Sequence, residues 1–117
     1  MEPAPSLPEV PPKLRAQAER IQALTEEMVS GMEADDWGRV TSAEEDRRPL
    51  LPQLIDAGFR EVGGESADTW LRWILETDQE VMDRGQRVRQ EMLEVRKEGV
   101  RMNRRARAYN DANGFGR

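Results

Sequence analysis

One row of residues, spaced seven apart along the second half of the chain, is apolar at every position. It reads Ile74, Val81, Val88, Val95, Met102 and Tyr109. A sustained repeat of seven with charged flanking positions is typical of a long helix that packs in a bundle or coiled coil. The companion row reads Leu71, Asp78, Gly85, Met92, Gly99 and Ala106. Because only half of this row is apolar, a simple two-stranded zipper is disfavoured.

Two helices are predicted ahead of this long one. The first begins at Leu14 and ends near residues 31–34, because apolar residues recur there at steps of three and four. Its stripe consists of Leu14, Ala18, Ile21, Leu24 or Thr25, Met28 and Met32. Asp35 then offers a side-chain cap for a second helix, and Asp36 suits the positive first turn of that helix.

Pro49 is expected to interrupt the second helix. A proline in mid-helix cannot donate to the hydrogen-bond ladder and costs ~3 kcal/mol. We therefore predict a kink or break at residues 46–48, with Pro49 opening a short continuation to about Ala57. Gly58 and the pair Gly63–Gly64 then mark a loop.

The third helix is predicted to begin with Ser66 as its cap and to run from Ala67 to Glu98. Cations precede Gly99 in the sequence RKEGV, which is typical of a helix end. A separable basic helix should follow over residues 100–109. With no alternating strand pattern in the chain, the prediction is an all-α fold: an antiparallel bundle of three helices plus a shorter C-terminal helix, with coiled-coil-like packing.

The chain is expected to divide into four parts. Five of its seven prolines lie within the first twelve residues, so residues 1–13 should be an extended or disordered tail. A passive tail is favoured over a ligand for a proline-recognition domain. Residues 14–98 form the predicted core, residues 99–110 the C-terminal helix, and residues 111–117 a frayed end.

Charge is distributed asymmetrically. Residues 1–83 carry 8 basic and 19 acidic side chains, net −11, whereas residues 84–117 carry 10 basic and 4 acidic, net +6. This asymmetry allows a nucleic-acid-binding arm or a C-terminal segment that pairs with the acidic remainder of the chain. Pairing within the chain or with another protein is favoured, because the whole chain is acidic.

The sequence contains neither cysteine nor histidine. Cys/His zinc sites, thiol nucleophiles and Ser-His-Asp triads are thereby excluded. Gly63–Gly64 is followed by Glu65 and fits no phosphate-binding loop. The acidic clusters are interpreted as solvated helix faces. We therefore expect no enzymatic activity, no metal and no cofactor.

The chain also lacks the roughly 20 consecutive apolar residues of a membrane-spanning helix. Its N-terminus has no basic start followed by an apolar run, so no signal peptide is expected. A soluble, cytoplasmic protein is predicted. Among the three tryptophans, Trp37 and Trp70 are expected in the core, whereas Trp73 could equally be an exposed anchor for a partner.

Four strings resemble the FliT family of flagellar export chaperones over about residues 14–110. They are DWGRV, EEDRRPLLPQLI, WILETDQEV and RARAYNDANG. The resemblance implies a small helical chaperone that keeps the flagellar filament cap protein soluble and delivers it to the type III export apparatus. Its further implied partners are the export gate and the export ATPase, and in some members the master transcriptional regulator of flagellar genes.

The resemblance also implies an apolar client-binding groove and a C-terminal helix that regulates access to it. Carried onto this sequence, the groove comprises Leu51, Leu54, Ile55, Ile74, Val81, Val88, Met92 and Val95. The regulatory helix is represented by Met102, Arg104, Arg105 and Tyr109.

Two alternatives stay open beside the chaperone. One is a homo-oligomeric coiled-coil structural or adaptor module, for which a homodimer is the simplest form. The other is a nucleic-acid-binding regulator that uses the basic C-terminal helix.

Overall fold

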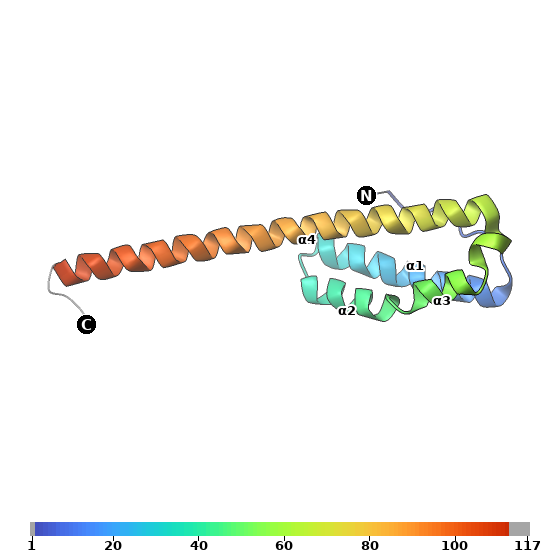
Figure 1. Cartoon of the computed structure of the whole chain (residues 1–117), viewed down its shortest axis with the longest axis horizontal. Coiled ribbons are helices and arrows are strands. Elements are labelled where there is room, and N and C mark those ends of the chain that lie inside the picture. Colours follow the sequence, from blue (N-terminus) through green and yellow to red (C-terminus); the bar gives the residue numbers. More distant parts are fainter. Residues whose placement is uncertain (1, 113–117) are drawn as a thin grey trace. The chain divides into compact units, whose positions relative to one another are not determined.

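The computed structural model describes the backbone of residues 2–112 and the side chains of residues 2–99. All regular structure in this range is helical (Figure 1). The helices are α1 (Pro12–Glu33), α2 (Trp37–Arg47), α3 (Leu50–Asp56) and α4 (Phe59–Ala112). The predicted all-α bundle is confirmed.

Two compact units divide the chain, Met1–Asp83 and Arg84–Arg117. We call them the bundle unit and the second unit. The boundary separates the acidic residues 1–83, with a net charge of −11, from the basic residues 84–117, with a net charge of +6. The bundle unit holds α1, α2, α3 and the first part of α4.

Helix α1 begins two residues earlier than the apolar stripe, at Pro12. Proline is tolerated in a first turn because the N–H group that it lacks would have no partner there. The predicted stripe is buried from Leu14 to Met32, with both Leu24 and Thr25 inside. An apolar face at steps of three and four therefore does identify the core side of α1.

The cap of α2 is Asp36, one residue later than predicted. Its carboxylate accepts a hydrogen bond from the backbone N–H of Arg39 at 3.2 Å. Asp35 instead adopts a left-handed backbone, with φ of 56°, and accepts from the indole N–H of Trp37 at 2.8 Å. The Asp35 cap was wrong because Asp35 is used in the turn that joins α1 to α2.

The predicted break at Pro49 is confirmed. Helix α2 ends at Arg47, and α3 begins at Leu50 and ends at Asp56. The pyrrolidine ring at position 49 removes one backbone donor, so the chain restarts as a separate short helix.

Helix α4 begins earlier and ends later than predicted. It starts at Phe59, bends at Gly64 (φ 59°, ψ −135°) and continues to Ala112. The expected loop with a Ser66 cap is therefore wrong. The chain turns at Gly64 alone, in a backbone conformation that residues with a side chain rarely adopt. The expected stop at Gly99 is also wrong, because a single helical glycine costs only about 1 kcal/mol relative to alanine.

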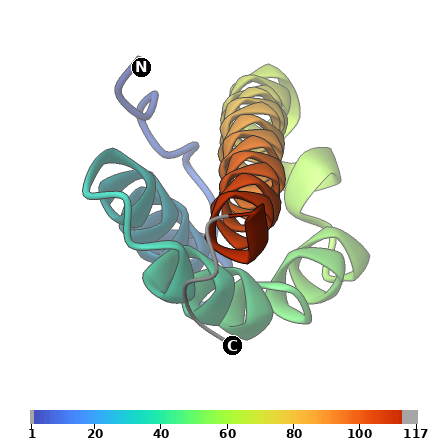
Figure 2. The ribbon, with the colours of Figure 1, turned by 90° about the vertical axis from the view of Figure 1, so that its left-hand side faces the viewer.

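The core of the bundle unit consists of two apolar clusters. The first joins α1, α3 and α4, and the rings of Phe59 and Trp70 meet edge to face there with centroids 5.3 Å apart. The second joins α1 and α2 to Val81 of α4. Figure 2 looks along the helices and shows α1, α2 and α3 beside the first part of α4.

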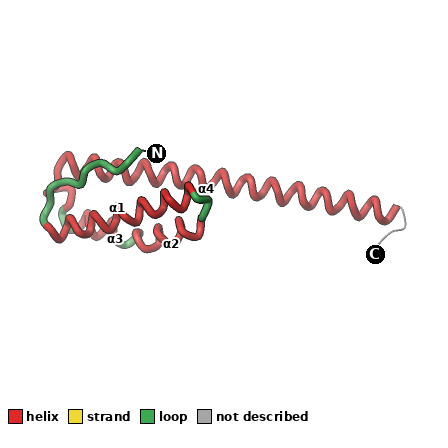
Figure 3. Tube along the Cα trace, turned by 180° about the vertical axis from the view of Figure 1, so that it is seen from behind, coloured by secondary structure: helices red, strands yellow, loops and turns green. Residues whose placement is uncertain are grey.

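Residues 2–11 run in an extended conformation beside α1 and α4 (Figure 3). We call this segment the strap. Its Ala4, Leu7 and Val10 pack against the first cluster, and Pro8 is buried. The extended conformation agrees with the prediction, but a passive, disordered tail is not what residues 2–11 show, because their apolar side chains find a packed surface.

Candidate functional site

An open groove lies between α3 and the first part of α4, within the bundle unit. It has a volume of about 470 Å³. We call it the α3–α4 groove. Its lining residues are Leu51, Ile55, Arg60, Asp68, Leu71, Arg72 and Leu75.

Apolar side chains line the α3–α4 groove, and some of them are partly buried while others are exposed to solvent. Leu51 and Leu71 are partly buried against the first cluster. The relative solvent exposure of Ile55 is 40% and that of Leu75 is 65%. Exposed leucine and isoleucine side chains that share one concave surface are typical of a protein-binding site.

The rim of the groove carries guanidinium groups. Arg60 is paired with Asp68 at 2.9 Å. Arg72 is exposed and forms no ion pair within the part of the chain whose side chains are described. This arrangement suits an amphipathic helix whose apolar face enters the groove and whose carboxylate meets Arg72.

The structure brings only two of the eight predicted groove residues, Leu51 and Ile55, into the α3–α4 groove. Leu54 and Ile74 are fully buried in the first cluster, and Val81 is buried in the second. Leu54 and Ile74 hold the helices together, whereas Val81 packs against α1 and α2 and also lines a separate pocket together with Met28 and Val40.

The remaining predicted groove residues lie in the second unit. Val88 is half-buried there, whereas Met92 and Val95 are exposed. Sequence reasoning missed Leu71 and Leu75 as lining residues. The signal for Leu71 was available, since it opens the companion row of the heptad pattern.

Met102, Arg104, Arg105 and Tyr109 lie outside the residues whose side chains are described. The regulatory role that the resemblance implies for them stays a prediction.

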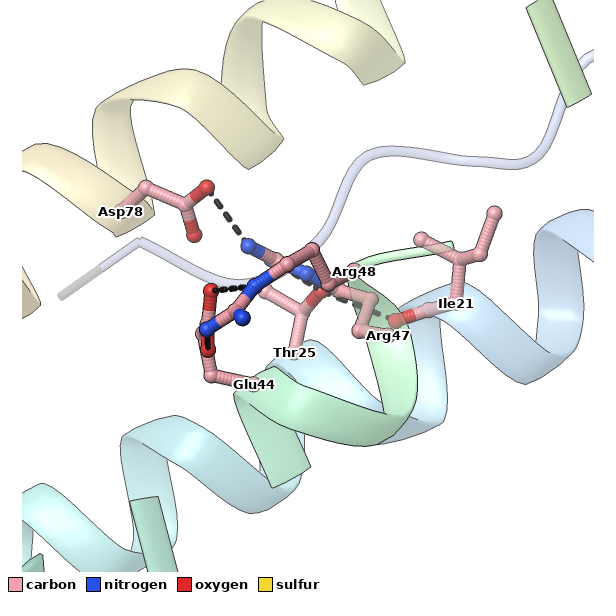
Figure 4. A network of polar contacts seen from close by, with 6 residues as sticks. All are labelled: Ile21, Thr25, Glu44, Arg47, Arg48 and Asp78. Carbon is pink, nitrogen blue, oxygen red and sulfur yellow. Dashed lines mark hydrogen bonds and ion pairs between the residues drawn. The ribbon is translucent and has the colours of Figure 1, made fainter. Parts of the chain in front are cut away.

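A buried polar network joins three helices of the bundle unit (Figure 4). Arg47 of α2 donates to Asp78 of α4 at 2.6 Å and to the hydroxyl of Thr25 in α1 at 3.0 Å. Thr25 in turn donates to the backbone carbonyl of Ile21 at 2.8 Å. Every partner belongs to the bundle itself, so the network is structural.

All three tryptophans are packed. Trp70 is fully buried and its indole N–H donates to Gln22 at 2.9 Å, while Trp37 is half-buried against the second cluster. Trp73 is also buried, and its indole N–H donates to the backbone carbonyl of Glu2 at 3.2 Å. The alternative of Trp73 as an exposed anchor is thus not realised while the strap is in place.

Within the described residues, no group of three or more acidic side chains is arranged to hold a metal ion. None of the helices there combines the length and the apolar character that crossing a membrane requires.

The chain is similar to a known protein family. The family model described as "Flagellar protein FliT" matches residues 15–111. No curated protein and no solved structure matches the chain significantly. The matched range includes all four helices except their outermost residues, and it leaves the strap outside.

Proposed function

Because the chain belongs to the FliT family of flagellar export chaperones, we propose that it binds the flagellar filament cap protein through the α3–α4 groove. It keeps this client soluble and delivers it to the type III export apparatus, including the export gate and the export ATPase.

The observation that supports this assignment is the exposed apolar edge of the α3–α4 groove. Leu75 and Ile55 leave apolar surface in water, and covering it returns about 25 cal/mol for each Å² removed from water. A client helix with apolar residues at steps of three and four would cover both side chains. Arg72 would orient that helix by pairing with a carboxylate at its edge.

The test is a pair of variants with the same change in charge and a similar starting exposure. Leu75→Asp places a carboxylate in the groove, whereas Val62→Asp places one on α4 at a side chain that is 54% exposed and does not line the groove. Binding of purified cap protein is measured by titration calorimetry. We expect Leu75→Asp to weaken binding at least ~tenfold, since an unpaired charge against apolar surface is costly.

Val62→Asp should bind the cap protein as the parent chain does. Circular dichroism of both variants establishes that each remains folded. Full affinity in a folded Leu75→Asp chain would place the client elsewhere and overturn the proposal.

Regulation of client access by residues 99–110 is a separate part of the proposal. It rests on the opposite net charges of the two units and on the family resemblance. A chain truncated after Glu98 should bind the cap protein more tightly, and added salt should narrow the difference. Weaker binding after truncation would make this segment part of the binding surface.

A homo-oligomeric coiled coil is a second candidate function, favoured by one feature of the second unit. Val88, Met92 and Val95 fall at steps of four and three, and the last two are exposed, as is Leu93. Such a row suits pairing with a second helix. Sedimentation equilibrium of the parent chain and of Met92→Glu tests it: a dimer that the substitution converts to monomer supports self-association.

A further inference from the structure

Burial along the strap repeats every three residues. Pro3, Ser6 and Glu9 are exposed, whereas Ala4, Leu7 and Val10 are partly buried, Pro5 is partly buried and Pro8 is buried. A polyproline II helix has three residues per turn, so every third side chain lies on the same face. Pro11 has φ of −53° and ψ of 151°, close to this conformation. The strap thus turns two of the three rows of a polyproline-type helix toward the bundle and one row, Pro3, Ser6 and Glu9, to solvent.

The surface beneath the strap is shaped to receive it. At Gly63 an added Cβ atom would lie 2.7 Å from the Cβ of Ala67, 3.3 Å from the Cβ of Pro8 and 3.4 Å from a methyl carbon of Val10. A side chain at position 63 would therefore clash first with Ala67 in α4 and would also be tight against Pro8 of the strap. At the other end the indole of Trp73 donates to the carbonyl of Glu2. We call the surface from Gly63 to Trp73, together with the adjoining face of α1, the strap seat.

This way of binding is not specific to the strap itself. Between Glu2 and the start of α1, the segment is held by the hydrogen bond from Trp73 and by the packing of Ala4, Leu7, Pro8 and Val10. Proline-rich ligands dock in the same manner, with an extended backbone over apolar and aromatic side chains and little entropy to lose. Another segment with the same three-residue spacing would fit as well.

The charge of the strap matches its seat poorly at one end. Two small cavities meet at Glu2 and Trp73: Glu76 and Glu80 line one, and Glu26 and Glu33 line the other. No lysine or arginine of the described residues lines either cavity. Glu2 therefore adds a fifth carboxylate to a region that already carries four. A segment with a cation at this point would bind better than the strap does.

We propose that the strap seat is a docking groove for an extended, proline-containing segment of a partner protein, with apolar residues at every third position and a lysine or arginine in the place of Glu2. The strap is the intramolecular competitor of that segment. This surface is separate from the α3–α4 groove, and the proposal does not depend on the identity of the chaperone's client.

The strap itself supplies the probe. Two acetylated, fluorescently labelled peptides cover residues 2–12, one with the natural sequence and one with Glu2→Lys. A third peptide of the same composition moves the apolar residues off the three-residue spacing. Their binding to two full-length chains is measured by fluorescence anisotropy. One is the parent, and the other carries Leu7→Ser and Val10→Ser, which weaken the strap without touching its seat.

The strap-weakened chain should bind the natural peptide. It should bind the Glu2→Lys peptide about two- to fivefold more tightly at low salt, and this difference in affinity should shrink as the salt concentration rises. The parent chain should bind both peptides at least ~tenfold more weakly, because its seat is occupied. The rearranged peptide should not bind either chain. Equal binding of all three peptides, or binding of none by a strap-weakened chain with its helical content intact, overturns the proposal.

Dimerisation of the strap-weakened chain in place of peptide binding would show that the seat takes a second copy, which also overturns the proposal. If that chain does not fold, the full-length Glu2→Lys chain replaces it. Its strap should be held more firmly, so quenching of tryptophan fluorescence by acrylamide should fall relative to the parent. Unchanged or increased quenching contradicts the charge argument.

Discussion

Asp78 of α4 accepts a hydrogen bond from the guanidinium of Arg47 in α2 at 2.6 Å, and this ion pair sits against the apolar core. The Arg47 side chain is only 7% exposed and that of Asp78 is 29% exposed. Thr25 satisfies a second N–H of Arg47. The pair fixes how α2 lies against α4, because a buried guanidinium without a partner would be strongly destabilising.

The first prediction concerns this pair. Asp78→Ala should lower the free energy of unfolding by about 3 kcal/mol, because it leaves the charge of Arg47 buried and unpaired. Arg48→Ala removes an exposed pair with Glu44, 2.5 Å apart, and should have a much smaller effect. Urea denaturation measures both. In the double variant Arg47→Met and Asp78→Leu most of the lost stability should return, and a double variant no better than Asp78→Ala would contradict this account.

Two neighbouring residues on α4 should respond oppositely to the same change. Ile74 is fully buried, so Ile74→Asp places a carboxylate in the core at a cost of several kcal/mol, comparable with the whole stability of a small domain. Leu75 is exposed, so Leu75→Asp should leave the helical content and the thermal midpoint nearly unchanged. Circular dichroism at 222 nm with heating distinguishes them. A folded Ile74→Asp chain would mean that the first cluster is not the core.

Glycines 64 and 99 should also respond oppositely to alanine. Apart from the adjoining backbone, neither has an atom within 4 Å of the position that a Cβ would take, so any effect arises from the backbone. Gly64→Ala imposes a side chain at φ of 59° and should cost about 1–3 kcal/mol, measured as a lower thermal midpoint. Gly99→Ala lies within a helix and should raise helical content. Loss of helix in Gly99→Ala would show that the helix does end there.

A pH dependence is expected from α1 and α2. Hydrogen bonding from Arg39, together with its charge, holds the pKa of Glu27 below its ordinary value, although partial desolvation opposes the shift. A carboxyl group whose pKa is lowered by folding stabilises the fold at pH values above its unfolded pKa of about 4.3. That contribution is lost as the pH falls through the folded pKa.

Arg39→Gln should therefore destabilise the chain above about pH 5 and have less effect at lower pH. Carbon-detected NMR titration of Glu27 should show its pKa moving up in the variant. A Glu27 pKa that Arg39→Gln leaves in place would contradict the role assigned to Arg39.

Several features followed from local sequence alone. The all-α fold, the buried stripe of α1 and the break at Pro49 were predictable, because periodicity and the missing proline donor act within one or two helical turns. The polar network around Arg47 could be predicted from the sequence only in part. Asp78 occupied a polar position in the companion row of the heptad pattern, but no local rule says that it meets Arg47 across 31 residues.

Tertiary structure decided how far each apolar residue is buried and whether the strap packs against the helices. Ile74, Val81 and Val95 share one heptad row, yet the first two are core and the third is exposed, because only the bundle unit surrounds its part of α4 with other helices. Leu54 is covered by the other helices of the bundle unit and is buried, whereas Ile55 and Leu75 are left exposed and line the α3–α4 groove. Proline spacing determined that residues 2–11 are extended, but packing against the first cluster and the hydrogen bond from Trp73 decided that they are packed. Periodicity reports which face of a helix is apolar, whereas burial depends on what the rest of the chain brings to that face.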